Sequence, residues 1–319
     1  MGRDSPRLVS VVLAVRNHAG PLTDQLAALA AQDYEADWEL VVADNGSTDG
    51  SRAVAHDFFE GGGVQGRIVD VSARRGAGAA RNGGAAAALG DLLAFCDADN
   101  VARPGWLRGL AEAAPDADLM VGASLLDRLN SPDHAAWMGN PAGDRAPVGL
   151  GFMPFANAGN CAYWADAFEA LGGFDLEFEG GEDMDLSWRA QLAGYRLAFA
   201  PGAEMDRRCR DRLGALTRQH WSWGRASGRL IRSYRIRGMD HGARAEAGYV
   251  SGGLRRLPRA ALSRADRGRW LAQAALASGR WFELVSSGLR SRASGAPAPP
   301  PAGARGPAGG APGTGRTGP

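Results

Sequence analysis

Residues 8–15 read LVSVVLAV, an unbroken apolar run that is rich in β-branched side chains. Such a run is typical of a strand that is buried on both faces, as the strands of a parallel sheet are. A helix is expected next, because Pro21 stands near its start and leucines recur behind it at helical spacing. The opening of the chain therefore predicts a strand followed by a helix.

The same alternation continues along the chain. Further strands are predicted over 38–43 (WELVVA), 67–71 and 91–96 (DLLAFC), and helices over 51–59 and 77–89. Strands that alternate with helices through residue 125 indicate an α/β fold with a doubly wound, Rossmann-like and mostly parallel sheet.

The second half of the chain has weaker periodicity. Residues 127–154 are rich in Pro, Gly, Asp and Asn, which predicts a long surface excursion of a kind that often carries function. The remaining predictions are a helix over 165–171, an acidic cluster leading into a helix over 186–192, basic helices over 212–236 and 259–290, and a disordered Pro/Gly/Ala-rich tail over 294–319.

Composition and charge restrict the function classes. The chain has 319 residues, with Lys+Arg 36 against Asp+Glu 35 and a net charge of +1, which argues against a dedicated nucleic-acid binder. Its three cysteines, Cys96, Cys161 and Cys209, are too few and too scattered for a disulfide framework or a structural zinc site, and fit a reducing cytoplasm. Neither a secretion signal nor a membrane-spanning helix is predicted.

The sequence DNGSTDG begins at Asp44, directly after the predicted strand 38–43. Ligands of open α/β sheets bind beyond the carboxyl ends of the strands, so Asp44 is placed to accept hydrogen bonds from a base or a ribose. The alternative is a turn at Asn-Gly followed by a helix cap from Ser47 or Asp49. Both interpretations can hold together.

Asp97 and Asp99 flank Ala98 immediately after the strand 91–96. Residues two apart in extended backbone project to the same side, so the two carboxylates can converge on one Mg²⁺ or Mn²⁺ ion. Such an ion keeps coordination sites open for diphosphate oxygens. A solvated acidic turn is the alternative for an isolated pair, and the position after the fourth strand favours the metal.

Glu182, Asp183 and Asp185 open the helix that continues through 186–192. The helix dipole favours carboxylates in a first turn and would keep their pKa values low. A carboxylate with a low pKa is a weak base, but it can still take a proton from a hydroxyl within hydrogen-bond reach. Asp185 and Arg189 are four residues apart, which predicts a supporting ion pair.

Arg81 lies among small residues in RRGAGAARNG, residues 74–83. A phosphate could approach its guanidinium closely here. No G-x-G-x-x-G follows the first strand, which counts against a dinucleotide-binding enzyme.

The motifs VSVVLAVRN, VVADNGSTDGS, GAARNGGAAAALGDLLAFCDADN, NAGNCAYW and GGFDLEFEGGEDMDLSWRAQLAGYRL occur in this order. Together they resemble a family 2 glycosyltransferase of the GT-A fold, over roughly residues 8–205. The resemblance implies an inverting transferase that uses a nucleoside diphosphate sugar and a divalent metal, Mg²⁺ or Mn²⁺. It also implies four parts: a nucleotide-sugar-binding half over 1–126, an acceptor-side half over 127–211, a basic helical extension over 212–293, and the tail.

The resemblance further implies roles for individual residues. Asp183 is the expected general base, with Glu182 assisting in positioning. Asp97 and Asp99 are the expected metal ligands, Asp99 more directly, and Arg81 is expected to approach the pyrophosphate. The expected substrate-binding positions are Val15, Arg16, Asn17, Asp44, Asn45, Arg81, Asp97, Ala98 and Trp188.

Two positions depart from the family pattern. Asp206 stands where members often carry a His as a further metal ligand, and its carboxylate oxygens suit Mg²⁺ or Mn²⁺ as well. The Gln-x-x-Arg-Trp signature of processive synthases is only partly matched by RQHWSW over 218–223. The second departure favours transfer of a single sugar.

The basic helices mix arginines with tryptophans and leucines. This composition fits peripheral contact with an anionic membrane, and it fits a helix docked on the sheet domain equally well. The expected partners are a nucleoside diphosphate sugar and a hydroxyl acceptor (glycan, lipid or small molecule), with no nucleic acid. The expected location is the cytoplasm, with membrane contact at the inner face of the plasma membrane. Two alternative functions stay open, a polyprenyl-phosphate sugar synthase and a catalytically silent sugar-nucleotide-binding or scaffold protein.

Overall fold

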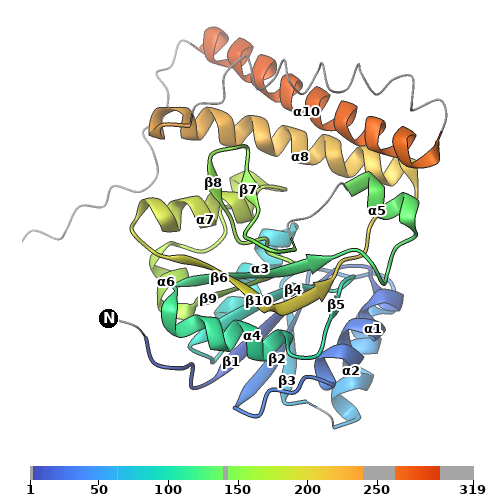
Figure 1. Cartoon of the computed structure of the whole chain (residues 1–319), viewed down its shortest axis with the longest axis vertical. Helices are drawn as coiled ribbons and strands as arrows, with labels where there is room; N and C mark the ends of the chain where they lie inside the picture. The colour runs from blue at the N-terminus through green and yellow to red at the C-terminus, as the bar shows by residue number, and fades with distance from the viewer. Residues whose placement is uncertain (1–2, 63, 139–142, 240–262, 295–319) are drawn as a thin grey trace, which may run out of the picture.

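The computed structural model describes residues 3–62, 64–138, 143–239 and 263–294 (Figure 1). The predicted tail beyond residue 294 and the start of the last predicted helix, residues 259–262, lie outside the described residues. Within the described ranges, no helix is both long enough and apolar enough to cross a bilayer.

A mixed sheet of eight strands lies at the centre of the molecule (Figure 1). Its strand order is β3-β2-β1-β4-β9-β6-β10-β5. The strands are β1 (Val9–Val15), β2 (Trp38–Asp44), β3 (Gly66–Asp70), β4 (Leu92–Asp97), β5 (Val101–Ala102), β6 (Leu119–Leu125), β9 (Asn160–Trp164) and β10 (Leu197–Asp206). The first four are mutually parallel, as predicted.

Strand β9 divides the sheet into two parallel blocks. It runs antiparallel to β4 on one side and to β6 on the other, and β6 pairs in parallel with β10. The short β5 closes the far edge antiparallel to β10. The predicted alternation of strands and helices is therefore confirmed in the first half, and the antiparallel insertion of β9 is an addition that the alternation did not predict.

Helices cover both faces of the sheet. The helices are α1 (Ala19–Ala30), α2 (Ser51–Glu60), α3 (Ala77–Ala86), α4 (Trp106–Ala113), α5 (Pro132–Met138), α6 (Ala165–Ala170), α7 (Glu182–Leu192), α8 (Leu213–Tyr234) and α10 (Arg264–Ser294), with 3₁₀ turns η1 (Ala114–Asp116), η2 (Leu176–Phe178) and η3 (Arg235–Arg237). Helices α1, α2 and α4 pack with Val11 and Leu13 of β1, while α6 and α7 pack on the side of Val12. Because β1 contributes to both cores, its continuous apolar run is explained.

Helix α3 approaches the sheet very closely. A Cβ at Gly84 would lie 2.5 Å from Val12, and a Cβ at Gly83 would collide with Val71. These two glycines therefore let the backbone of α3 rest on the strands. This contact fixes the position of Arg81, one turn earlier in the same helix.

The stretch 127–154 has more structure than the predicted excursion. It contains α5 and a hairpin of β7 (Val148–Gly149) and β8 (Met153–Pro154), with residues 139–142 outside the described ranges. Trp137 of α5 is buried against Leu216 and Ala272 of the C-terminal helices. Tertiary packing, which is invisible in the local pattern, orders this segment.

Helices α8 and α10 form the outermost layer of the molecule (Figure 1). They pack side by side at two glycines: a Cβ at Gly224 would collide with the carbonyl of Leu276, and one at Gly279 with the carbonyl of Trp221. Tyr234 of α8 packs on Trp188 of α7 and donates a hydrogen bond of 2.8 Å to Asp185. The docking alternative for these helices is therefore confirmed.

Candidate active site

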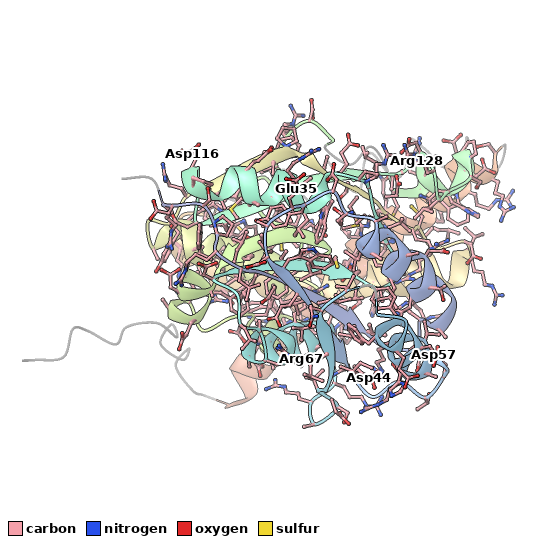
Figure 2. The ribbon with its side chains drawn as sticks, turned by 90° about the horizontal axis from the view of Figure 1, so that it is seen from below. Glu35, Asp44, Asp57, Arg67, Asp116 and Arg128 are labelled. Atoms are coloured by element: carbon pink, nitrogen blue, oxygen red, sulfur yellow. The ribbon has the colours of Figure 1, made fainter. Side chains whose placement is uncertain are left out.

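The carboxyl ends of three neighbouring strands bring the first predicted site residues to one edge of the sheet. Val15 of β1 is in register with Asp44 of β2, and Ala14 with Asp97 of β4. Asp44 lies at this edge beside the start of α2, where its carboxylate is 3.7 Å from the guanidinium of Arg52 (Figure 2). Parallel register alone thus gathers these residues.

The loops after β1 and β2 are joined by hydrogen bonds. Asn17 adopts the left-handed region, with φ 55°, and its Oδ1 accepts a hydrogen bond of 2.7 Å from the amide of Thr48. Asp44 Oδ1 accepts from the amide of Ser47 at 3.0 Å, and Asp49 Oδ1 accepts from the amide of Ser51 at 2.9 Å. The turn interpretation of DNGSTDG is confirmed, and a ligand contact by Asp44 stays a prediction.

The side chain of Asn45 braces the loop before α3. Its Nδ2 donates to the carbonyls of Val71 at 2.7 Å and Arg74 at 2.9 Å, and its Oδ1 accepts from the amide of Gly76 at 3.0 Å. Of the other predicted substrate positions at this edge, Arg16 is exposed and Val15 is buried. Asn45 therefore positions the loop with its side chain.

Arg81 is the centre of the site. Its Nη2 lies 2.7 Å from Asp97 Oδ1 and its Nη1 lies 3.0 Å from Glu182 Oε1, and the residue is only 6% exposed. Burial alone would lower the pKa of this guanidinium, but the charges of Asp97 and Glu182 outweigh it and raise the pKa above its ordinary value. Arg81 therefore joins the Asp-x-Asp motif to the Glu-Asp pair, a contact that the sequence did not predict.

Glu182 completes the start of α7. Its Oε2 accepts hydrogen bonds from the amides of Gly180 at 2.7 Å and Gly181 at 3.0 Å, while its other oxygen binds Arg81. Gly180 and Gly181 immediately precede α7, and the amide of Gly181 also donates to the carbonyl of Phe178 at 2.7 Å. Both oxygens of Glu182 are thus engaged in positioning.

Asp183 is a carboxylate whose pKa is raised. Its Oδ1 accepts from the amide of Met184 at 2.8 Å and its Oδ2 from the amide of Ala158 at 3.4 Å. Burial of the carboxylate and the neighbouring charge of Glu182 raise its pKa to about 6. The expectation that the helix dipole keeps this pKa low is wrong, because desolvation and charge repulsion outweigh the dipole.

The loop between β8 and β9 connects Asp183 to Asp97. The amide of Ala158 contacts Asp183, and a Cβ at the next residue, Gly159, would lie 2.6 Å from Asp97 Oδ2. The two carboxylates therefore flank one short loop although they are far apart in the chain. The stretch NAGN belonged to the motif pattern, but the sequence analysis gave this loop no role. Its contribution is the backbone amide of Ala158, which binds Asp183, and the absence of a side chain at Gly159 beside Asp97.

Asp99 is covered by basic side chains. Its Oδ2 lies 3.2 Å from Arg210 Nη1 and 3.7 Å from His18 Nε2, and its carbonyl accepts from Arg208 Nε at 3.2 Å. Sequence reasoning missed Arg208, Arg210 and His18. The available signal was the basic run Arg207-Arg208-Cys209-Arg210 after a strand that was itself not predicted.

The Asp-x-Asp pair offers carboxylate oxygens as possible ligands for a hard cation. Arg81 occupies one oxygen of Asp97 and Arg210 one oxygen of Asp99, and no hydrogen bond within the described ranges occupies Asp97 Oδ2 or Asp99 Oδ1. Gly159 leaves the space beside Asp97 Oδ2 clear of a side chain. Carboxylate oxygens with room for further ligands fit Mg²⁺ or Mn²⁺.

Asp206 is placed differently from the expectation. It is 3% exposed at the end of β10, and its Oδ1 lies 2.9 Å from Arg103 Nε and 2.6 Å from Arg103 Nη2. Its other oxygen lies 3.8 Å from Arg128. Two arginines therefore pair with this carboxylate, and its metal-ligand role stays a prediction.

Two predicted substrate contacts lie in the hydrophobic core. Trp188 is 0% exposed, donates its indole hydrogen bond to the carbonyl of Met153 at 3.1 Å, and packs on Phe152 and Tyr234. Ala98 is 2% exposed and belongs to the core of the sheet. Their side chains pack behind the site, and a contact of these two residues with substrate stays a prediction. The predicted pair of Asp185 and Arg189 is confirmed at 2.8 Å.

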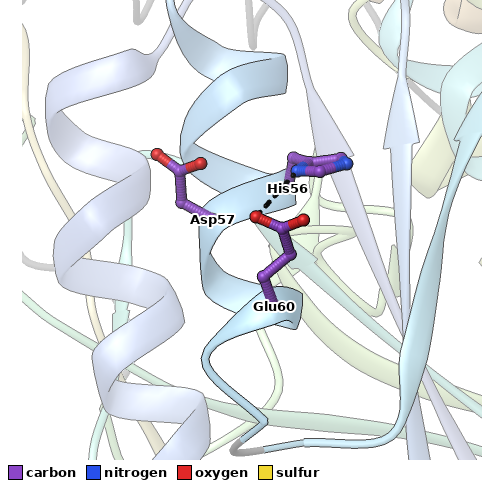
Figure 3. Close-up of side chains that lie close together, drawn as sticks. All are labelled: His56, Asp57 and Glu60. Carbon is purple, nitrogen blue, oxygen red and sulfur yellow. Dashed lines mark ion pairs between the residues drawn. The ribbon is translucent and has the colours of Figure 1, made fainter.

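A different group of metal-type side chains lies on α2. His56, Asp57 and Glu60 bring their ligand atoms within 4.8 Å of one another, and within the described residues no other group of three does so (Figure 3). All three are exposed, and His56 pairs with Glu60 at 3.5 Å across one helical turn. A surface ion pair explains this group.

A cavity of about 150 Å³ adjoins the centre of the site. Its walls come from the loop and first turn of α3, from η2 and from Glu182. Two arginines, Arg74 and Arg75, and two further carboxylates, Asp175 and Glu179, are among its lining residues. The cavity therefore meets the candidate site at Glu182, the ion-pair partner of Arg81.

Comparisons with protein families agree with this arrangement. The family model for glycosyl transferase family 2 matches residues 10–172, and that for glycosyl transferase family group 2 matches residues 92–282. Pre-mycofactocin glycosyltransferase of Mycobacterium tuberculosis is 32% identical over 208 residues, which cover 62% of this chain and 42% of the relative. Glycosyltransferase AglE of Haloferax volcanii is 30% identical over 195 residues, covering 60% and 64%. The chain therefore spans less than two thirds of these relatives.

Solved structures share the fold at low sequence identity. The mannosyltransferase PcManGT from Pyrobaculum calidifontis, in complex with GDP-Man and Mn²⁺, gives a TM-score of 0.63 at 20% identity and covers 89% of this chain and 88% of its own. TarS of S. aureus in complex with UDP-GlcNAc gives 0.51 at 16% identity, covering 88% and 92%. The expected GT-A fold is confirmed.

Proposed function

Because the chain belongs to glycosyl transferase family 2, we propose that it transfers a single sugar from a nucleoside diphosphate sugar to a hydroxyl acceptor, with inversion at the anomeric carbon. The observation that carries the proposal is the buried Arg81, which ties Asp97 to Glu182 beside Asp183. One guanidinium thus holds the donor-side carboxylate and the acceptor-side carboxylates at a single site.

Asp183 is the general base in this proposal. With a pKa of about 6, it is ionised at neutral pH and basic enough to accept a proton in the transition state. The acceptor oxygen attacks the anomeric carbon as its proton passes to Asp183. The bond from that carbon to the diphosphate breaks, and the nucleoside diphosphate leaves with the electron pair. A single displacement of this kind inverts the configuration.

Asp97 and Asp99 are the proposed ligands of Mg²⁺ or Mn²⁺, through the oxygens that Arg81 and Arg210 do not occupy. A bound divalent cation would supply stabilisation of the negative charge that develops on the departing diphosphate. The complex of PcManGT with GDP-Man and Mn²⁺ supports this choice of cofactor. Asp206 is left out of the ligand set because Arg103 engages it.

The edge formed by β1 and β2 is the proposed nucleoside subsite, with Asp44 as its acceptor of hydrogen bonds. Residues 1–126 form the donor half and residues 127–211 the acceptor half in this proposal. The solved neighbours carry GDP-Man and UDP-GlcNAc, which supports a nucleoside diphosphate sugar as the donor class. The free cysteines Cys96, Cys161 and Cys209 support the proposed cytoplasmic location.

The test is donor turnover by the purified chain. A panel of nucleoside diphosphate sugars is incubated with the protein and Mn²⁺ or Mg²⁺, and release of nucleoside diphosphate and thermal unfolding are both measured. A donor at 100-fold over its dissociation constant should stabilise the fold by about 2.7 kcal/mol. Asp99→Ala should abolish the metal-dependent part of this shift, and Asp183→Asn should keep the shift but lose turnover.

Asp166→Asn is the matched control, because Asp166 is an exposed carboxylate with an arginine partner outside the site. It should behave as the unaltered chain does. Binding of donors without turnover, even with broad acceptor mixtures, would instead support a sugar-nucleotide-binding protein. Full transfer activity in both Asp99→Ala and Asp183→Asn would refute the assigned roles.

A further inference from the structure

Four large apolar side chains are exposed together on α8 and α10. They are Trp221, Trp281, Phe282 and Val285, with exposed fractions of 38%, 70%, 48% and 41%. The rings of Trp221 and Phe282 are 5.7 Å apart, and Val285 follows Trp281 by one helical turn. We call these four residues the aromatic face.

The aromatic face is a concentration of apolar surface on an otherwise ordinary exterior. Seven large apolar side chains are exposed within the described residues, and four of them lie here. The other three, Leu89, Val148 and Leu192, come from three separate segments. Clustered exposed aromatic side chains mark interaction sites, whereas isolated ones need no explanation.

The charges around the aromatic face are positive. Helix α8 contains four arginines and no Asp or Glu. Arg225 stacks 5.7 Å from the ring of Phe282. From residue 267 to 294 the single acidic residue is Glu283, which is buried and ion-paired to Arg225 at 3.1 Å and Arg229 at 3.6 Å. Its charge is therefore neutralised beneath the surface.

We propose that the aromatic face binds the surface of a lipid bilayer that contains anionic lipids. Tryptophan and phenylalanine side chains enter the headgroup region, because their large rings gain from leaving water. Arginines beside them meet lipid phosphates, to which an anionic leaflet adds long-range attraction. A second copy of this chain is a poorer occupant, since a symmetric contact would set arginines against arginines.

This mode of binding would orient the proposed active site. The opposite side of α8 packs against the start of α7: Ala226 and Leu230 lie within about 3 Å of a Cβ built at Gly181, and Tyr234 binds Asp185. The helix that carries Asp183 is therefore packed directly against the helix pair that binds the membrane. An active site oriented in this way would take its hydroxyl acceptors from the bilayer. This second step rests on the proposed function, whereas the membrane binding does not.

The experiment is vesicle flotation of the full chain. Phosphatidylcholine vesicles are compared with vesicles that also contain phosphatidylglycerol, at low and at high salt. The chain should float with the anionic vesicles, and less so at high salt. The double variant Trp281→Ser, Phe282→Ser should lower the partition coefficient at least about tenfold, because two large rings no longer bury. Tryptophan fluorescence of the unaltered chain should shift to the blue on binding.

Leu89→Ser is the control, because it also removes an exposed large apolar side chain, outside the aromatic face. It should float as the unaltered chain does. Failure to float with anionic vesicles, or equal flotation of the double variant, would overturn the proposal. So would light scattering that finds a dimer which the double variant converts to a monomer. Donor turnover without vesicles is measured in parallel, and the double variant should retain it, so loss of binding and loss of activity are separate results.

Discussion

Replacing Arg81 by Met tests the central contact of the site. The substitution keeps much of the side-chain volume but leaves Glu182, which is buried, and Asp97, whose side chain is about one third exposed (35%), without their shared partner. Breaking a buried ion pair by removing one partner costs about 3–5 kcal/mol. Water screens the contribution of Asp97, so the lower end of this range is expected, roughly 3 kcal/mol of unfolding free energy.

Thermal and urea unfolding measure this loss. A loss of about 3 kcal/mol should lower the midpoint of thermal unfolding by roughly 4–6 °C for a chain of this size. Arg7→Met is the matched control, because Arg7 pairs with Asp91 at 3.0 Å while its side chain is 88% exposed. Its loss should stay below about 1 kcal/mol.

A second substitution separates charge from packing. Adding Glu182→Gln to Arg81→Met removes the stranded buried charge, so the double variant should recover part of the lost stability. The reasoning is refuted if Arg81→Met destabilises no more than Arg7→Met. It is also refuted if adding Glu182→Gln lowers the free energy of unfolding of Arg81→Met further instead of raising it.

Three further predictions concern the chemistry of the site. Asp183→Asn should lower the turnover number by about 10²–10⁴ with donor affinity retained. The unaltered enzyme should lose activity as the pH falls through about 6, because Asp183 takes up a proton there, and a flat pH–rate profile would contradict this. Gly159→Ala should weaken Mn²⁺ binding in titration calorimetry by about tenfold or more, because its Cβ would stand 2.6 Å from Asp97 Oδ2, and unchanged affinity would exclude that oxygen as a ligand. Arg210→Gln should strengthen binding of Mn²⁺ alone about two- to fivefold, since the positive charge beside Asp99 no longer repels the cation, and should weaken nucleoside diphosphate binding; the reverse pattern would show that Arg210 supports the metal site.

Local patterns predicted the elements whose own residues decide them. Residues 9–15 and 92–97 are strands because their apolar runs are buried on both faces, and each was expected within about two residues. Strand β9 was not predicted, because the direction and place of the five residues NCAYW depend on β4 and β6 on either side. Helix α7 begins at Glu182, as expected from the acidic residues that open it, although the predicted apolar stretch covered only residues 186–192.

At the candidate site, too, some features follow from the local sequence and others depend on tertiary contacts. Residue type and spacing were enough to choose the candidate carboxylates, since only a few acidic residues follow buried strands or open helices. The partners of those carboxylates could not be found, because Arg81 and Arg210 come from segments with no local relation to Asp97 or Asp99. Burial was equally hidden: nothing in the local sequence separates the core position of Trp188 from a position in a binding cleft.

The balance of charge at the site explains why its parts belong together. Asp97, Asp99, Glu182 and Asp183 bring four carboxylates to the region, while Arg81 and Arg210 bring two guanidiniums. The formal excess of two negative charges is the charge that a divalent cation would balance. In the proposed mechanism, a diphosphate arriving afterwards would add negative charge again, and the partly exposed Arg210 would exchange Asp99 for a phosphate. Arg81 is buried and paired with a carboxylate on each side, so it would hold these carboxylates in place during the proposed exchange.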